Sequence, residues 1–382
     1  MKKLLLSSIL LLTVIAFLIE ENIQAQNGNE HILKSFPNWI TNFDKTKIDL
    51  KELRSGGPPK DGIPAIMNPK FVDPHEADDW LADIEPVIAL EINGEAKAYP
   101  LQILIWHEIV NDKLSDTLVT VTFCPLCYSA LVFNRRTKGM ENMFGVSGLL
   151  RNSDMVMYDQ ITESFWQQFT GEAIVGEMLG EQLELIPSQI ISFQQFKNNY
   201  PNGKVLSNET GFKREYGLNP YIGYDHIDQT PFMFDGPDDD RLKPNEKVIA
   251  VKLPEVSIAY PYSITEDKNV INDDPGSYKI AVFHSSGAVS ALDERIIEDS
   301  KATGSTGVFN RIIDNDTLNF SYSEGWFFDD KTNSKWTITG KAIEGKYKGK
   351  KLERIPHGDY FAFAWLVFRP ETKIYNHLIR ER

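Results

Sequence analysis

The chain has 382 residues, 42% of them hydrophobic and 11% aromatic, which is typical of a globular protein and argues against general disorder. This length suits two domains or one duplicated domain. The net charge of −14 makes nucleic acid and anionic membrane surfaces poor partners. We therefore expect an unknown small molecule or protein as the partner, and no membrane contact beyond an export signal.

The N-terminus has the pattern of a secretory signal peptide. Two lysines precede an apolar run over residues 4–19, and a polar stretch that ends at Ala25 follows it. We predict export to the periplasm or the medium, with removal of residues 1–25. An uncleaved N-terminal membrane anchor is the alternative, because Ile23-Gln24-Ala25 is a poor match to a small-x-small cleavage site.

Residues 26–84 are polar and irregular, and we expect them to form an N-terminal arm. Strand-like runs begin after them. Val87–Ile92 and Ala96–Tyr99 flank Asn93-Gly94, whose residues both tolerate the positive φ of a type I′ turn, so a hairpin is predicted. Pro100 suits the first position of a short helix, which we expect over Leu101–Trp106.

The rest of the chain contains an internal duplication. Ala89–Pro100 aligns without gaps with Ala250–Pro261. Farther along, Trp166–Gly176 resembles Trp336–Gly345, and both segments are followed by Leu-Glu and then Ile-Pro. Matches that recur in the same order indicate two copies of one structural unit.

The duplication defines repeat one over residues 85–205, a linker over 206–245 and repeat two over 246–377. In each repeat, short β-branched and aromatic runs are broken by Gly, Asn and Asp, and one clear helix is expected after Ile-Pro, over 192–199 and 359–368. The predicted fold class is mainly β with a few helices (α+β). We expect two tandem pseudo-symmetric β-rich repeats packed as two lobes.

Both cysteines lie in one turn, Cys124-Pro125-Leu126-Cys127. Redox Cys-x-x-Cys motifs usually place the first thiol at a helix N-terminus, where the helix dipole lowers its pKa. Here the strand-like run Ala130–Phe133 follows, which favours a metal knuckle whose two thiolates bind one soft ion. A structural or redox-active disulfide and a pair of inert thiols stay open as alternatives.

A complete metal site needs further ligands, and two histidines are the candidates. His107 is the histidine nearest to the cysteines in sequence, and His284 aligns with Cys124 after a one-residue gap between the repeats. We therefore predict a copper, zinc or iron ion bound by Cys124, Cys127 and His107 and completed by His284. Its role would be metal handling or thiol redox chemistry, which leaves open whether the protein is an enzyme.

Two other functions fit the sequence. One is a non-catalytic module that binds a ligand or partner in a cleft, with the cysteines joined in a structural disulfide. The other is a hydrolase that uses paired carboxylates around an aromatic platform, as in carbohydrate enzymes. Its candidates are Asp154, Asp159, Glu163, Glu172 and Trp166. A core position is the simpler role for this tryptophan and its counterpart in repeat two.

Several segments together resemble a known family. They are Gly56–Ala65, His107–Asp112, Phe123–Cys127, Phe144–Asp154 and Trp166–Gly171. This combination is similar to the DUF3179 family, exported bacterial proteins of unknown function. The resemblance supports export and attention to His107 and the two cysteines, but it implies no reaction. Tyr128 stands where the resemblance implies a small residue such as glycine.

Overall fold

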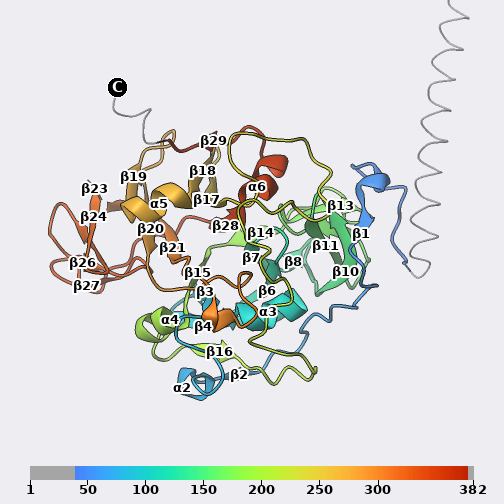
Figure 1. The fold of residues 1–382 in the computed structure, drawn as a ribbon, viewed down its shortest axis with the longest axis horizontal. Coiled ribbons are helices and arrows are strands. Elements are labelled where there is room, and N and C mark those ends of the chain that lie inside the picture. Colours follow the sequence, from blue (N-terminus) through green and yellow to red (C-terminus); the bar gives the residue numbers. More distant parts are fainter. Residues whose placement is uncertain (1–38, 377–382) are drawn as a thin grey trace, which may run out of the picture.

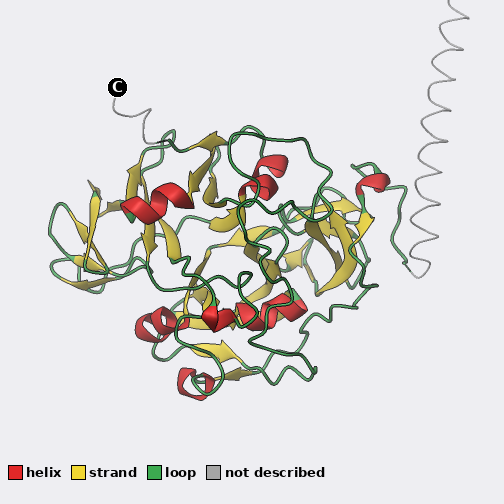
Figure 2. Cartoon of the chain, in the orientation of Figure 1, coloured by secondary structure: helices red, strands yellow, loops and turns green. Residues whose placement is uncertain are grey.

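The computed structural model describes residues 39–376 (Figure 1), so the predicted signal peptide and its cleavage site lie outside the described residues. Strands dominate and the helices are few and short, which confirms the predicted mainly β class (Figure 2). Within residues 39–376, no helix has the length and apolar character needed to cross a membrane.

A five-stranded sheet, which runs from the middle of the molecule to its lower edge in Figure 1, has the order β15-β3-β4-β16-β2. Its strands are β2 (Phe71–Val72), β3 (Pro86–Ile92), β4 (Glu95–Pro100), β15 (Ser188–Ser192) and β16 (Lys204–Leu206). The turn between β3 and β4 has φ 52° at Asn93 and 84° at Gly94, which confirms the predicted hairpin.

Two further sheets complete the first half of the body. One has the order β14-β7-β6-β5, with β5 (Ile109–Leu114), β6 (Thr117–Cys124), β7 (Ser129–Asn134) and β14 (Glu184–Ile186). The other has the order β1-β10-β11-β12-β13, with β1 (Arg54–Ser55), β10 (Phe144–Arg151), β11 (Asp154–Asp159), β12 (Phe165–Gln167) and β13 (Glu172–Val175). A small ribbon pairs β8 (Arg136–Thr137) with β9 (Met140–Glu141).

The second half of the chain also forms three sheets and a small ribbon. The first has the order β28-β17-β18-β29, with β17 (Lys247–Lys252), β18 (Ser257–Pro261), β28 (His357–Phe361) and β29 (Lys373–Ile374). The second contains β19 (Val270–Asp273), β20 (Ile280–Ser285) and β21 (Ser305–Asn310). The third contains β24 (Phe320–Ser323), β25 (Trp326–Asp329), β26 (Lys335–Trp336) and β27 (Ala342–Glu344), and β22 (Ile312–Ile313) pairs with β23 (Asp316–Thr317).

Short helices join and cover these sheets. They are η1 (Leu50–Glu52), α2 (Pro74–Ala77), α3 (Leu101–His107), α4 (Phe193–Asn199), α5 (Tyr262–Lys268), η2 (Ile297–Asp299) and α6 (Ala362–Phe368). Pro100 is the N-cap of α3, and Ser192 forms a capping box with Gln195 at the start of α4, as its sequence pattern indicates. The helix predicted from residue 359 begins only at Ala362, because the residues before it form β28.

Equivalent side chains make the same contacts in the two halves. The indole Nε1 of Trp166 donates to Asp159 Oδ2 at 3.0 Å, and that of Trp336 donates to Asp329 Oδ2 at 3.0 Å. Further matched pairs are Tyr99 to Asp112 with Tyr260 to Asp273, and Phe144 N to Asn111 with Phe320 N to Asn272. Both tryptophans are fully buried, as expected of core residues.

The two largest hydrophobic clusters contain residues from both halves. One joins Phe123 to Val248 and Trp365, and the other joins Val87 to Phe283. Strand β15 of the first half packs against β21 of the second half, and β7 of the first half packs against β28 of the second half. The halves therefore share much of their core, although two smaller clusters each lie on one side.

Strand β6, which leads into the cysteine turn, is buried on both faces. The alternation of Thr and apolar residues predicts one buried face, but Thr120 and Thr122 are fully buried as well. The side chain of Gln168 covers this second face and donates to Thr122 Oγ1 at 2.7 Å. Both the strand and the turn that follows it are therefore buried in the interior of the protein.

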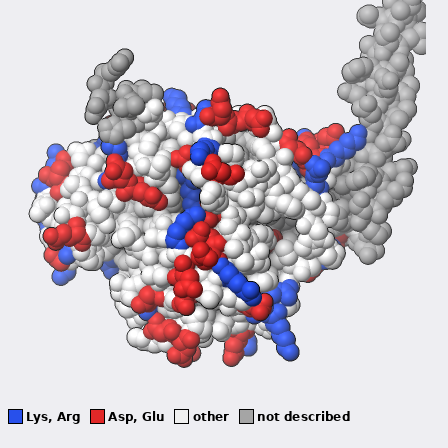
Figure 3. Space-filling model, viewed as in Figure 1, with Lys and Arg blue, Asp and Glu red and all other residues white. Residues whose placement is uncertain are grey.

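The surface agrees with the charge composition. On the face shown in Figure 3, acidic and basic side chains lie interspersed and no broad basic surface is visible. This mixture does not favour a polyanionic partner on that face.

Candidate metal centre

The two cysteines lie at the junction of β6 and β7. Cys124 is the last residue of β6, and the turn is closed by hydrogen bonds from Cys127 N to Cys124 O and from Tyr128 N to Pro125 O, at 3.3 and 3.2 Å. Tyr128 has φ 54°, in the left-handed region that glycine adopts without strain. The backbone thus has the shape for which a small residue was expected, although tyrosine occupies it.

The cysteines are free thiols, 1% and 0% exposed, and are not joined in a disulfide. Asp154, the first residue of β11, is also fully buried. One ligand atom from each of Cys124, Cys127 and Asp154 lies within 4.8 Å of the other two. These three residues form the metal-ligand group that the structure brings together.

The two carboxylate oxygens of Asp154 differ in their hydrogen bonds. Its Oδ2 accepts from Gln167 Nε2 at 2.5 Å and from Phe169 N at 2.9 Å. Its Oδ1 is buried and accepts no hydrogen bond from a nitrogen or hydroxyl group, so its neighbouring donors are the two thiols, which lie close enough to lower the pKa of the carboxyl. Thiols are weak donors, and a bound cation would satisfy this buried oxygen better.

Burial disfavours the charged forms of all three ligands. Desolvation raises the pKa of Cys124, raises that of Cys127 well above its ordinary value and raises the pKa of Asp154 to about 7. Thiols in such surroundings are poor nucleophiles, because the thiolate is the reactive form. A cation favours the deprotonated ligands and reverses these shifts.

Glu108 stands between this group and a pocket. It is the C-cap of α3, and it is 7% exposed. Burial, followed by the nearby Asp154 carboxylate, raises the pKa of Glu108 to about 8. A second acidic group therefore lies near Cys124, and a cation bound beside it would favour its ionised form.

His107 lies apart from the cysteine group, between the N-terminal arm and the linker. Its Nδ1 donates to Pro64 O at 2.7 Å, and its Nε2 accepts from the Tyr216 hydroxyl at 2.6 Å. Burial lowers its pKa. Both ring nitrogens are engaged, and this histidine is not one of the residues within ligand distance of the sulfurs.

His284 is engaged in the same way in the second half. Its Nδ1 accepts from Thr265 Oγ1 at 2.8 Å, and its Nε2 donates to Thr303 O at 3.1 Å. Burial lowers its pKa to about 4. It too is outside the group formed by the cysteines and Asp154.

The alignment of His284 with Cys124 is off by one residue. The backbone N of His284 donates to the C-cap residue of α5 at 2.7 Å, as the backbone N of Phe123 donates to the C-cap residue of α3 at 2.8 Å. In the strand ladders, Cys124 pairs with Ser129 and Ser285 pairs with Ser305. The residue that corresponds to Cys124 is therefore Ser285, and the gap in the alignment is unnecessary.

The other carboxylates considered for a hydrolase are engaged in separate contacts. Asp159 accepts from the indole of Trp166 and from the following turn, Glu163 pairs with Lys60, and Glu172 pairs with Lys47. They do not form a carboxylate pair around an open aromatic platform, because the tryptophan is fully buried. The structure offers no support for that hydrolase site.

Asp154 and Glu108 are absent from the predicted ligand set. They lie far from the cysteines in sequence, and a hairpin and a helix end bring them close. The sequence does indicate a turn just before Asp154, because Asn152 tolerates a positive φ. In the structure Asn152 and Ser153 have φ 51° and 68°, and their turn places Asp154 at the start of β11. No rule of sequence spacing connects that turn to the cysteine knuckle.

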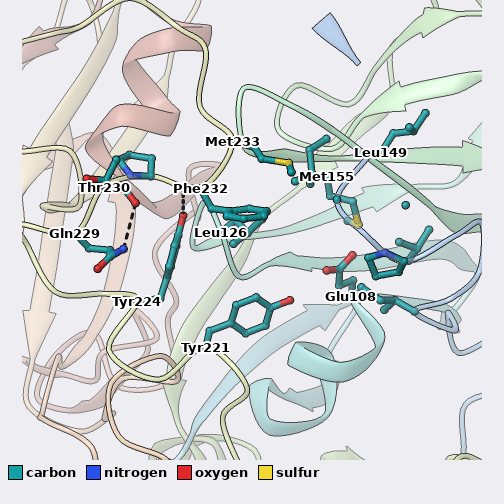
Figure 4. A pocket seen from close by; sticks show the side chains of 17 residues that line it. Glu108, Leu126, Leu149, Met155, Tyr221, Tyr224, Gln229, Thr230, Phe232 and Met233 are labelled. Carbon is teal, nitrogen blue, oxygen red and sulfur yellow. Dashed lines mark hydrogen bonds between the residues drawn. The ribbon is translucent and has the colours of Figure 1, made fainter. Parts of the chain in front are cut away.

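A pocket of about 580 Å³ lies on the outer side of Glu108 (Figure 4). Leu126 from the cysteine turn and Met155 next to Asp154 form part of its wall, together with Tyr221 and Tyr224. Neither Cys124 nor Cys127 is among the residues that line it. The centre is therefore buried but close to a space large enough for a small molecule.

Comparison with protein families gives one match. Residues 60–372 match a family described as "Protein of unknown function (DUF3179)". Searches against curated proteins and against solved structures find no match. Since the matched region covers most of the chain, including the cysteine turn, Asp154 and both halves of the body, the protein belongs to the DUF3179 family.

Proposed function

We propose that the protein binds one borderline or soft metal ion through Cys124 Sγ, Cys127 Sγ and Asp154 Oδ1. The observation that carries this proposal is the convergence of the three ligand atoms within 4.8 Å in a fully buried group. Two thiolates favour zinc, copper or iron, and the carboxylate oxygen favours zinc or iron over copper(I). Zinc fits this donor set best.

The thiol environment supports a metal role over a thiol redox role. Redox-active cysteines are usually exposed and have a depressed pKa. These thiols are buried, and their pKa values are raised. Three protein ligands also leave a tetrahedral zinc ion one open position, which is the ligand count of catalytic zinc sites.

Zinc retention by the purified full-length chain tests this proposal. After loading with zinc and removal of the excess, we expect about one equivalent per chain in the wild type. The variants Cys124→Ser and Asp154→Asn should retain much less, and circular dichroism should confirm that they are folded. Ser285→Ala is the matched control, because Ser285 has the ladder position of Cys124 in the second half.

The proposal fails if the folded wild-type chain retains no zinc, copper or iron. It also fails if the control Ser285→Ala loses the metal as completely as Cys124→Ser. Retention of metal by the cysteine variant would place the ion elsewhere in the chain.

We also propose that the body arose by duplication and that the chain works outside the cytoplasm. The duplication is supported by the matched contacts of Trp166 and Trp336, and by the packing of β7 on β28 and of β15 on β21. Export is supported by the apolar N-terminal run alone. The N-terminal sequence of the protein recovered from cells would locate the cleavage site.

A further inference from the structure

The pocket beside the proposed metal centre is almost entirely apolar. It is lined by aliphatic, aromatic and small residues, namely Ile63, Leu126, Val146, Met155, Tyr221 and Phe232 among others. The hydroxyl of Tyr224 accepts from Phe232 N at 3.0 Å and fixes the outer wall (Figure 4). A pocket of this kind and size buries the apolar body of a small organic molecule.

Glu108 is the one ionisable carboxylate in this lining. Of the described residues that line the pocket, none is Lys, Arg or His, and no other is acidic. Glu108 is 7% exposed, and its carboxylate has no hydrogen bond or ion pair within residues 39–376. Figure 4 shows it directed into the pocket, on the side of Leu126 and Met155. A buried, unpartnered carboxylate at this place calls for a ligand that pairs with it.

The backbone gives no reason for a glutamate at this position. Glu108 has φ 56° and ψ −31°, and Asn269, at the same place after α5, has φ 58° and ψ −30°. Asn tolerates a left-handed conformation better than Glu does. An asparagine such as Asn269 is therefore sufficient to end the helix. The turn does not require the carboxylate of Glu108, so we look for another role for it.

The surroundings of the pocket favour a positive charge. Asp154 lies close enough to raise the pKa of Glu108 electrostatically. If a divalent ion binds to two thiolates and one carboxylate, the centre keeps one negative charge, so metal loading does not reverse this preference. The rings of Tyr221, Tyr224 and Phe232 offer π faces that attract an organic cation.

We propose that this pocket binds an organic ammonium ion with an apolar body, and that its charged nitrogen pairs with Glu108. Once Glu108 is ionised, its negative charge excludes carboxylates and phosphates. This site goes beyond the proposed metal function and does not depend on it, because the pocket, its aromatic wall and Glu108 are separate from the three metal ligands.

Calorimetric titration with three matched probes tests the proposal. Octylamine, octanol and octanoate share one apolar chain and differ in the charge of the head group. At pH 9, where Glu108 with its pKa of about 8 is ionised and octylamine is still an ammonium ion, the wild-type chain should bind octylamine about tenfold or more tighter than octanol, as expected for a buried charged hydrogen bond. It should bind octanoate more weakly than octanol.

Variants assign this preference to one residue. Glu108→Gln should lose the tenfold preference for octylamine and keep its affinity for octanol, which also shows that the pocket is intact. Glu108→Asn, with the residue type found at the equivalent turn, should do the same. Glu324→Gln is the matched control, because Glu324 also has a positive φ, of 50°, but is exposed and outside the pocket.

The results that overturn the proposal are distinct from loss of the metal. They are binding of octanoate as tight as that of octylamine, an unchanged octylamine preference in both Glu108 variants, and no binding of any of the three probes. Each titration is done on the zinc-loaded and the chelator-treated protein, and the preference should be the same in both.

Discussion

At the scale of single residues, the interior of this protein holds many ionisable groups whose pKa values are shifted by burial. The group at the cysteine turn is one example. Another is Glu85, which accepts hydrogen bonds from Ala82 N at 3.1 Å and from Gln102 Nε2 at 2.9 Å. Its pKa is raised from 4.5 to about 7, mainly by burial. Such a group makes the stability of the protein depend on pH.

The substitution Glu85→Gln should remove part of that dependence. Since the folded-state pKa of Glu85 lies above the unfolded value, its contribution to stability is complete below pH 4.5 and is lost as the pH rises through about 7. Urea unfolding should give equal free energies for wild type and variant in acid. At about pH 8 the Glu85→Gln variant should be more stable than the wild type by up to about 3 kcal/mol.

The exposed Glu76 provides the control, since Glu76→Gln should leave the difference near zero at every pH. A difference in the free energy of unfolding between wild type and Glu85→Gln that stays the same at every pH would contradict this. It would show that Glu85 has the same pKa in the folded and unfolded states.

At the scale of elements, one strand-to-strand turn in each half has the same contacts. Asp159 and Asp329 each accept from a tryptophan indole and from the threonine three residues on. Each carboxylate thus closes a turn and anchors a fully buried tryptophan. Two positions with the same partners should contribute equally to stability.

Alanine substitution tests this equivalence. Asp159→Ala and Asp329→Ala should each lower the free energy of unfolding by about 3 kcal/mol, because several buried donors lose their partner at once. Urea denaturation should give values within about 1 kcal/mol of each other. Asp116→Ala, at a fully exposed side chain, should have almost no effect. A large effect at only one of the two aspartates would contradict the equivalence.

The elements that could be predicted from the sequence have local signals. The Asn93-Gly94 hairpin and the Ser192 capping box depend on residues close together in the chain, and both are present. The burial of both faces of β6 depends on Gln168, far along the sequence, so alternation of residue types could not reveal it. The cysteine turn could be recognised locally, but its partner Asp154 could not.

At the scale of the whole molecule, the halves are joined through their cores. Phe123 of the first half and Val248 of the second belong to one cluster, and Val87 and Phe283 belong to another. The order of matching segments predicts two similar units, because it compares residues at equal positions. It cannot predict that strands of one unit pack against strands of the other, since that depends on contacts between dissimilar segments.

This shared core should make unfolding cooperative. In urea, the loss of strand signal in the far-ultraviolet circular dichroism and the loss of tryptophan fluorescence should follow the same curve. Two separate transitions, one for each half, would contradict a common core. A fit to one transition should hold for both signals in the wild type and in Asp116→Ala.

Cobalt(II) absorption tests most directly whether the cysteine turn and Asp154 form a metal centre. Cobalt(II) in place of zinc absorbs strongly in the near ultraviolet when thiolates bind it. We predict such a band at one equivalent of cobalt for the wild type, its retention in Ser285→Ala and its loss in Cys124→Ser/Cys127→Ser. A folded wild-type chain that takes up cobalt without this band, or takes up none, would contradict the claim.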